Sequence, residues 1–379
     1  MGTESAGLHA CRLNAIVAGR LRFRNVQRGM SVQSIKTPLP GWRIEGASTS
    51  TFSDCSLIIA TYQRPNEVLE LVERIDELSS KPFEVIVVDG SPGWETEEKL
   101  RSWTAQVKAD FDLTYVKCPA GLTRQRNAGI DLTSGNYVFF LDDDCLPQAN
   151  YFAEIRRVFH KDTAGKVGAV SGLISNEMQA PLSLRWRMRL ALGLVPRLSP
   201  GIYDASGTSL PANMISAFSG LREIDCLSGC AMTFRRAVFN QHRFSEFFSG
   251  YSQGEDLEMS LRIRRHWTIL WCGDAHAIHC HAPGGRPPSF RKGVMEVHNR
   301  YFIWKRHRPD VARLDRLRFW LDIAFLVAFD LLSFCRYPRQ VHHLSHAGGL
   351  VRGAIHSLFR SPSYQEPLTQ TRYELQVTG

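Results

Sequence analysis

Three consecutive aspartates, Asp142, Asp143 and Asp144, directly follow an apolar run at residues 137–141 that is rich in aromatic side chains. Such a run is typical of a buried central strand. Adjacent carboxylates repel one another and hard divalent cations prefer carboxylate oxygens, so this cluster could hold a metal ion. Ligands bind at the carboxyl ends of strands in open α/β sheets. For an isolated triplet, a solvated acidic turn is the better interpretation. A metal site is favoured only if other parts of the chain supply further ligands.

Acidic residues in two other segments could take part in the same chemistry. Asp89 follows a second buried-type strand at residues 83–88, and Glu255 and Asp256 follow Gly254 at the start of a predicted helix. A carboxylate placed close to a hydroxyl can act as a general base. Both positions also have an ordinary structural explanation, because acidic residues cap helices and complement the helix dipole.

The elements that would position these residues alternate between strand and helix. Apolar runs predict strands near residues 56–62, 83–88, 113–116, 137–141, 167–174, 226–234 and 267–271. This order predicts an α/β fold with a mostly parallel sheet that is flanked by helices on both faces. Residues 182–198 interrupt the alternation, and they are interpreted either as a strand or as a basic, aromatic segment at a membrane interface.

Four motifs in this order resemble family 2 glycosyltransferases of the GT-A fold over roughly residues 55–285. They are Ala60-Thr61-Tyr62, Val88-Asp89-Gly90-Ser91, Arg126-Asn127-Ala128-Gly129 before Leu141-Asp142-Asp143-Asp144, and Gly254-Glu255-Asp256. The resemblance implies a nucleotide-diphosphate sugar donor, a Mg²⁺ or Mn²⁺ ion, and a single displacement that inverts the anomeric carbon. The Gln-x-x-Arg-Trp motif of processive members is absent, so we expect one sugar to be transferred per encounter.

The resemblance also implies a role for each motif residue. Donor nucleotide binding falls to Ala60, Thr61, Tyr62, Asp89, Arg126 and Asp142. The metal ligands would be Asp144, Asp142 and one histidine, His281 or His279, with His281 preferred. Asp256 would be the catalytic base and Glu255 would orient the acceptor, whereas Asp143 has no assigned role and is expected to face solvent.

The segment after residue 285 is basic and helical. Between Arg286 and Arg360 there are 14 Lys and Arg against 5 Asp and Glu, which accounts for the net charge of +9 of the whole chain. Within it, residues 319–335 are rich in apolar side chains and carry only two charges, Asp322 and Asp330, which share one face of a helix. In order of preference, this run predicts an amphipathic helix in the membrane surface, a buried helix, or a membrane span.

These patterns divide the chain into an N-terminal extension (1–50), a GT-A catalytic domain (51–285) and a membrane-associating C-terminal region (286–379). Scattered cysteines and the lack of a signal-peptide core predict a cytoplasmic protein that is peripheral at the inner face of the cell membrane. The expected acceptor is a glycan, lipid-linked by preference, and no nucleic acid is expected.

One alternative, a nucleotidyltransferase, would need a glycine-rich phosphate loop that residues 60–65 lack. A noncatalytic membrane or nucleic-acid binding protein would leave the acidic motifs unexplained.

Overall fold

The computed structural model describes residues 34–47, 51–179, 181–195, 199–210, 214–284, 286–360, 362, 364 and 370–377. Most of the predicted N-terminal extension, residues 1–33, lies outside this part. The strands are β1 (Ser34–Ile44), β2 (Thr51–Thr61), β3 (Lys81–Asp89), β4 (Asp112–Lys117), β5 (Tyr137–Asp142), β6 (Cys145–Pro147), β7 (Val167–Ile174), β8 (Leu221–Glu223), β9 (Ala231–Arg235), β10 (Thr268–His279) and β11 (Gln370–Val377). The helices are α1 (Pro65–Glu77), α2 (Glu95–Thr104), α3 (Leu122–Leu132), α4 (Tyr151–Lys161), α5 (Leu184–Ala191), α6 (Glu255–Ile263), α7 (Ser289–His307), α8 (Arg313–Arg336), α9 (Val341–Phe359) and the short 3₁₀ helix η2 (Arg236–Asn240).

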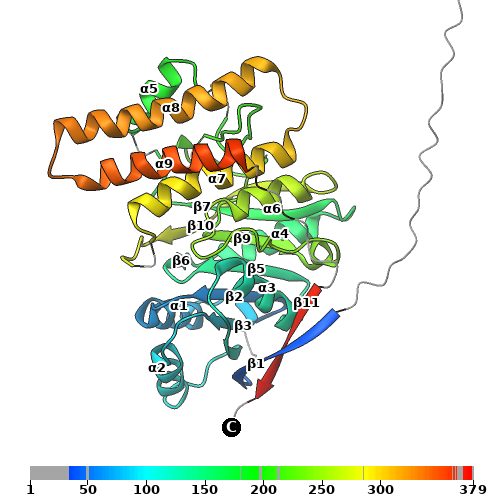
Figure 1. The fold of residues 1–379 in the computed structure, drawn as a ribbon. Coiled ribbons are helices and arrows are strands. Elements are labelled where there is room, and N and C mark those ends of the chain that lie inside the picture. The colour runs from blue at the N-terminus through cyan, green and yellow to red at the C-terminus, as the bar shows by residue number, and fades with distance from the viewer. Residues whose placement is uncertain are drawn as a thin grey trace, which may run out of the picture.

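One mixed sheet forms the centre of the molecule, in the order β11-β1-β4-β3-β2-β5-β9-β7-β10-β6, with β8 on the side of β10 (Figure 1). The strands β4, β3, β2 and β5 are parallel, while β9 runs antiparallel between β5 and β7. Side chains alternate across a strand, so Ile58 packs in the core on one face and Leu57 and Ile59 in the core on the other. The predicted α/β fold is confirmed. Besides the β4-β3-β2-β5 centre, β7 pairs parallel with β10 and β11 pairs parallel with β1.

Both flanking segments contribute strands to this sheet. β1 pairs antiparallel with β4, and β11 pairs parallel with β1, so the two outermost strands on this side come from opposite ends of the chain (Figure 1). The sheet therefore extends beyond the predicted catalytic domain of residues 51–285.

The segment at 182–198 contains a helix, α5, and its interpretation as a strand is wrong. The helix begins after Ser183, whose hydroxyl accepts a hydrogen bond from the amide of Trp186. Its Arg189 stacks on the Trp186 ring and donates two hydrogen bonds of 2.7 Å to Asp322 of α8. The alternation of arginine with apolar residues thus belongs to a helix with one buried arginine. The ion pair between Arg189 and Asp322 outweighs the strand-like pattern of the sequence.

The α8 helix packs in a layer with α7 and α9 at the end of the molecule far from β1 (Figure 1). Its two aspartates lie on the buried side: Asp322 is 0% exposed and also binds Arg300, and Asp330 accepts a 2.6 Å hydrogen bond from His346. The opposite side of α8 exposes apolar residues at helical spacing, among them Leu314, Leu317 and Leu321. Within the described residues, no helix combines the length and apolarity that crossing a membrane requires.

Candidate active site

The three predicted strand ends meet because the parallel register aligns them. Ala60 lies opposite Asp142, and Thr61 lies opposite Asp89, so β2, β3 and β5 end at the same edge of the sheet. Tyr62 follows at this edge with 42% of its surface exposed, which leaves its ring available to a ligand.

Asp142 and Asp144 converge with His279, and their ligand atoms all lie within 4.8 Å of one another. His279 ends β10 and pairs with Cys145 of β6, which places its ring beside Asp144. The Nε2 atom of His279 lies 3.3 Å from Oδ1 of Asp144, and the amide of Ala282 donates to Oδ2 at 2.8 Å. Burial alone would raise the pKa of Asp144, but these hydrogen bonds hold it below its ordinary value.

The geometry brings His279 rather than His281 to the aspartates. Glu177 accepts a hydrogen bond from Nδ1 of His279 at 2.9 Å and lies 3.1 Å from Nε2 of His281. The side chain of His281 is 51% exposed. A carboxylate that binds the second ring nitrogen of a histidine is the usual support for a metal ligand. Hydrogen bonds to Asp144 and Glu177 raise the pKa of His279 to about 11 in this arrangement.

Asp143 does not face solvent as expected, because the turn after β5 directs it back toward β2. It is 4% exposed and accepts hydrogen bonds from Thr61 Oγ1 at 2.7 Å and Arg64 Nη1 at 2.8 Å. Burial raises the pKa of Asp143 to about 6, against the opposing charge of Arg64. Arg64 also reaches Asp144 and the carbonyl of Gly284, so it holds the acidic turn and the loop after β10 together. Sequence reasoning missed Arg64, although it directly precedes Pro65 in the loop that follows the first catalytic strand.

Asp89 is fully buried and is bound by three donors of the protein. Its carboxylate accepts hydrogen bonds from the Ser91 amide at 2.8 Å, the Tyr115 hydroxyl at 2.9 Å and the Lys117 ammonium at 3.1 Å. Lys117 in turn lies 4.7 Å from the ring centroid of Trp94, a residue that is 50% exposed. Lys117 was not predicted, because its position beside Asp89 depends on the β3–β4 pairing, and Trp94 was not predicted because it enters only through its contact with Lys117.

Arg126 connects the aspartate cluster to the start of α6. It is 2% exposed and donates to Glu255 at 2.7 Å, Asp142 at 3.1 Å and the carbonyl of Gly229 at 2.9 Å. Burial, reinforced by the charge of Asp256, raises the pKa of Glu255 to about 8, while Arg126 opposes the shift. The donors of Arg126 are thus largely engaged with the protein.

Asp256 differs from Glu255 in its surroundings. Its Oδ1 accepts a 2.8 Å hydrogen bond from the Leu257 amide, and Oδ2 faces Gly229, where an added Cβ would stand 2.8 Å away. No side-chain partner holds Oδ2 within the part of the chain that the structure describes. Burial raises the pKa of Asp256, although the Leu257 amide opposes this. A carboxylate with one open oxygen and a raised pKa has the properties of a general base.

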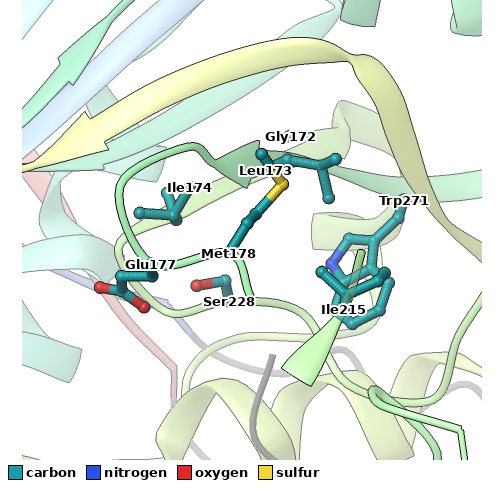
Figure 2. A pocket seen from close by; sticks show the side chains of 8 residues that line it. All are labelled: Gly172, Leu173, Ile174, Glu177, Met178, Ile215, Ser228 and Trp271. Carbon is teal, nitrogen blue, oxygen red and sulfur yellow. The ribbon is translucent and has the colours of Figure 1, made fainter. Parts of the chain in front are cut away.

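A small pocket lies beside the site at the end of β7. Figure 2 shows Glu177 on one side of it, Trp271 and Ile215 on the other, and Met178 between them. Its volume of about 20 Å³ suffices for about one water molecule and is too small for a substrate.

Comparisons with known proteins agree with this architecture. Residues 56–243 match the family model described as glycosyl transferase family 2. An uncharacterized glycosyltransferase of Haemophilus influenzae is 31% identical over 91 residues, which are 24% of this chain and 29% of that protein. The mannosyltransferase PcManGT from Pyrobaculum calidifontis, solved in complex with GDP-Man and Mn²⁺, has a TM-score of 0.51 and 15% identity. That match covers 84% of this chain and 90% of the other. Residues 56–243 therefore form a glycosyl transferase family 2 domain, and the chain has the GT-A fold.

Proposed function

We propose that this protein transfers one sugar from a nucleotide-diphosphate sugar to a hydroxyl of a glycan acceptor, with inversion at the anomeric carbon and with a divalent metal ion. The observation that carries the proposal is the buried Arg126, which joins the Asp142 side of the site to Glu255 beside Asp256. The part of the site that would bind the donor is thereby fixed to the part that carries the proposed base. The family match gives no support to a nucleotidyltransferase or to a noncatalytic binding protein.

The donor would bind at the ends of β2, β3 and β5. Tyr62 and Trp94 offer exposed aromatic surface for a base, and Asp89 would act largely by fixing Lys117 beside Trp94. The binding of GDP-Man by PcManGT, which shares the fold, supports a nucleotide-sugar donor.

Asp142, Asp144 and His279 would hold a Mg²⁺ or Mn²⁺ ion. Two carboxylates and one imidazole within 4.8 Å are a ligand set that suits Mn²⁺, the ion bound by PcManGT. When bound, the ion would neutralise the charge that develops on the leaving nucleoside diphosphate. Arg64 fixes the turn that carries Asp144.

Asp256 would accept the proton of the acceptor hydroxyl as that hydroxyl attacks the anomeric carbon and the nucleoside diphosphate leaves. Glu255 is tied to Arg126 and would position the helix start rather than take the proton. The change Asp256→Asn keeps the shape but removes the base, so we expect sugar transfer to fall by about 10²- to 10⁴-fold.

The test combines nucleotide sugars bearing UDP, GDP or TDP with Mn²⁺ and measures the release of nucleoside diphosphate and the anomeric configuration of the product. Nucleotide binding should persist in the Asp256→Asn variant. Transfer that is unchanged in this variant, or a retained anomeric configuration, would refute the proposed base and mechanism.

The C-terminal helices would attach the enzyme to the anionic inner face of the cell membrane, where lipid-linked acceptors reside. α8 and α9 both expose apolar residues at helical spacing: Leu314, Leu317, Leu321 and Leu332, then Val341, Leu344, Val351, Ile355 and Leu358. Arg316, Arg318, Arg339 and Arg352 are exposed on the same elements and their connection. Each Lys or Arg near an anionic membrane surface contributes about 1 kcal/mol to the free energy of membrane binding.

Sedimentation with vesicles tests this attachment. We expect binding to phosphatidylserine-containing vesicles, weaker binding to phosphatidylcholine alone, and strong loss for Leu317→Glu combined with Leu321→Glu. The control Ile35→Glu alters an exposed apolar residue on β1, remote from this layer, and should bind as the wild type does. Equal effects of both changes would argue against a membrane-binding role of α8.

A further inference from the structure

A second cavity, of about 220 Å³, lies between α5, α6 and α7. Its lining includes Gly254 and Leu257, the residues that flank Glu255 and Asp256 in the sequence. Because successive helical residues rise by about 1.5 Å, the cavity begins within one helical turn of the proposed base. It is smaller than the sites that hold drug-sized ligands, so it would take one small molecule.

The cavity is lined by more positive than negative charge. Arg185, Arg189 and Arg300 contribute guanidinium groups. Arg189 and Arg300 share one counter-charge, because both bind Asp322. Arg185 pairs with Glu296 at 2.7 Å, and Glu296 also lies 3.3 Å from Nε2 of His346. Three arginines are thus balanced by only two carboxylates, Asp322 and Glu296, and Glu296 also interacts with His346.

Three lining residues carry buried polar atoms that have no hydrogen-bond partner in the described chain. These atoms are Oη of Tyr203, Nε of Arg185 and Oε1 of Gln253. Tyr203 is 2% exposed, so bulk water does not reach its hydroxyl. Buried polar groups in folded proteins are normally satisfied, by protein, water or ligand. Two of these atoms can donate a hydrogen bond and Gln253 Oε1 can only accept one.

We propose that this cavity binds the phosphate of a phosphorylated acceptor, and this inference rests on the proposed function. Arginine donors suit phosphate oxygens, and the excess positive charge favours a dianion. The acceptor atom of Gln253 fits a neighbouring sugar hydroxyl, and the Trp186 ring lines the cavity and offers an apolar surface for a sugar ring. An acceptor anchored here would present its free hydroxyl to Asp256. The enzyme would therefore act on a sugar phosphate, either free or carried by a lipid.

Calorimetric titration of the full chain in EDTA tests this, because removal of metal weakens phosphate binding at the donor site. The probes are glucose 1-phosphate, dodecyl phosphate and neutral glucose. We expect both phosphates to bind more tightly than glucose. Arg185→Gln should weaken phosphate binding about tenfold, which corresponds to one charge-assisted hydrogen bond. Its matched control is Arg187→Gln, the same change at an exposed position on the same helix, and it should leave binding unchanged.

Tyr203→Phe provides a variant that folds, because it removes only a hydroxyl without a partner. It should keep the thermal stability of the unbound protein and weaken binding of both phosphates by several-fold. A preference for glucose 1-phosphate identifies a soluble acceptor, whereas a preference for dodecyl phosphate identifies a lipid-linked one.

Equal loss in Arg185→Gln and Arg187→Gln, or no phosphate binding by the wild type, would overturn the inference. Binding of nucleoside diphosphates with Mn²⁺ is measured in parallel on the same samples. If that binding is intact while phosphate binding is absent, the phosphate site alone is wrong. If nucleotide binding is also absent, the proposed function itself fails.

Discussion

At the scale of single residues, two arginines determine how the acidic groups are arranged. Arg64 binds Asp143 and Asp144, and Arg126 binds Asp142 and Glu255. Each aspartate of the triplet therefore has a cationic partner before any metal is present. Such pairing lowers the repulsion between carboxylates and keeps Asp142 and Asp144 in position for a shared ligand.

His279 should matter more for metal binding than His281. His279→Ala removes the imidazole beside Asp144, and we expect Mn²⁺ affinity to fall by about 10- to 100-fold or more. His281→Ala removes a contact with Glu177 and one with the His279 ring but no group beside the aspartates, so we expect a change within a few-fold. Mn²⁺ titration followed by electron paramagnetic resonance measures both. A larger loss for His281→Ala would restore His281 as the ligand that the sequence favoured.

At the scale of elements, the position of Arg126 depends on close contact between α3 and β2. A Cβ at Gly129 would stand 2.5 Å from Ile58 Cγ2, so only glycine allows this approach. Gly129→Ala should destabilise the fold by about 1–3 kcal/mol through overpacking. Gly348→Ala on α9 is the matched control: its Cβ would meet Phe290 no closer than 3.6 Å, and we expect no loss of stability.

Chemical denaturation measures the two glycine variants. Nucleotide binding should also weaken in Gly129→Ala, because Arg126 lies one turn earlier on the same helix. Equal stability of the two variants would show that the α3–β2 contact yields easily and does not fix the site.

The helical layer should lose stability at alkaline pH through His346. This residue of α9 forms a 2.6 Å hydrogen bond with Asp330 of α8 and lies 3.3 Å from Glu296 of α7, and these two carboxylates raise its pKa from 6.5 to about 9. A raised pKa means that the stabilisation is complete below pH 6.5 and is lost as the pH rises through about 9. This pKa shift corresponds to about 3 kcal/mol of the free energy of unfolding.

Thermal unfolding from pH 6 to 10, with hydrogen exchange on α8 and α9, measures this effect. His346→Gln should remove most of the pH dependence, whereas His342→Gln, at an exposed position on the same helix, should retain it. An unchanged pH profile in His346→Gln would assign the effect to other groups.

At the scale of the whole molecule, local patterns predicted most of the catalytic sheet. The runs that end in Thr61, Asp89 and Asp142 were recognisable because each buried strand stops abruptly at polar residues. The parallel register then requires these ends to meet. Helix α6 was predicted from Gly254 and the acidic pair that follows it, and the structure confirms that it begins at Glu255.

Contacts between distant segments could not be predicted in the same way. The sequence gives no indication that Asp143 binds Arg64, 79 residues earlier, or that Asp322 binds Arg189, 133 residues earlier. The apolar run at 319–335 illustrates the consequence. Its aspartates would face water on an isolated amphipathic helix. In the folded chain, Arg189 of α5 and Arg300 of α7 pair with Asp322 and allow it to be buried.

The central claim is that Asp142, Asp144 and His279 form a metal-dependent site for the donor diphosphate. The most direct measurement is the thermal shift of the full chain with UDP, GDP, TDP and CMP, each with and without Mn²⁺. A ligand at 100 times its Kd stabilises the native state by about 2.7 kcal/mol. We predict that at least one nucleoside diphosphate raises the Tm only with Mn²⁺ and that Asp144→Asn abolishes the shift. Folded protein that shows no shift with any of them, or a shift that is independent of both Mn²⁺ and Asp144, would contradict the account.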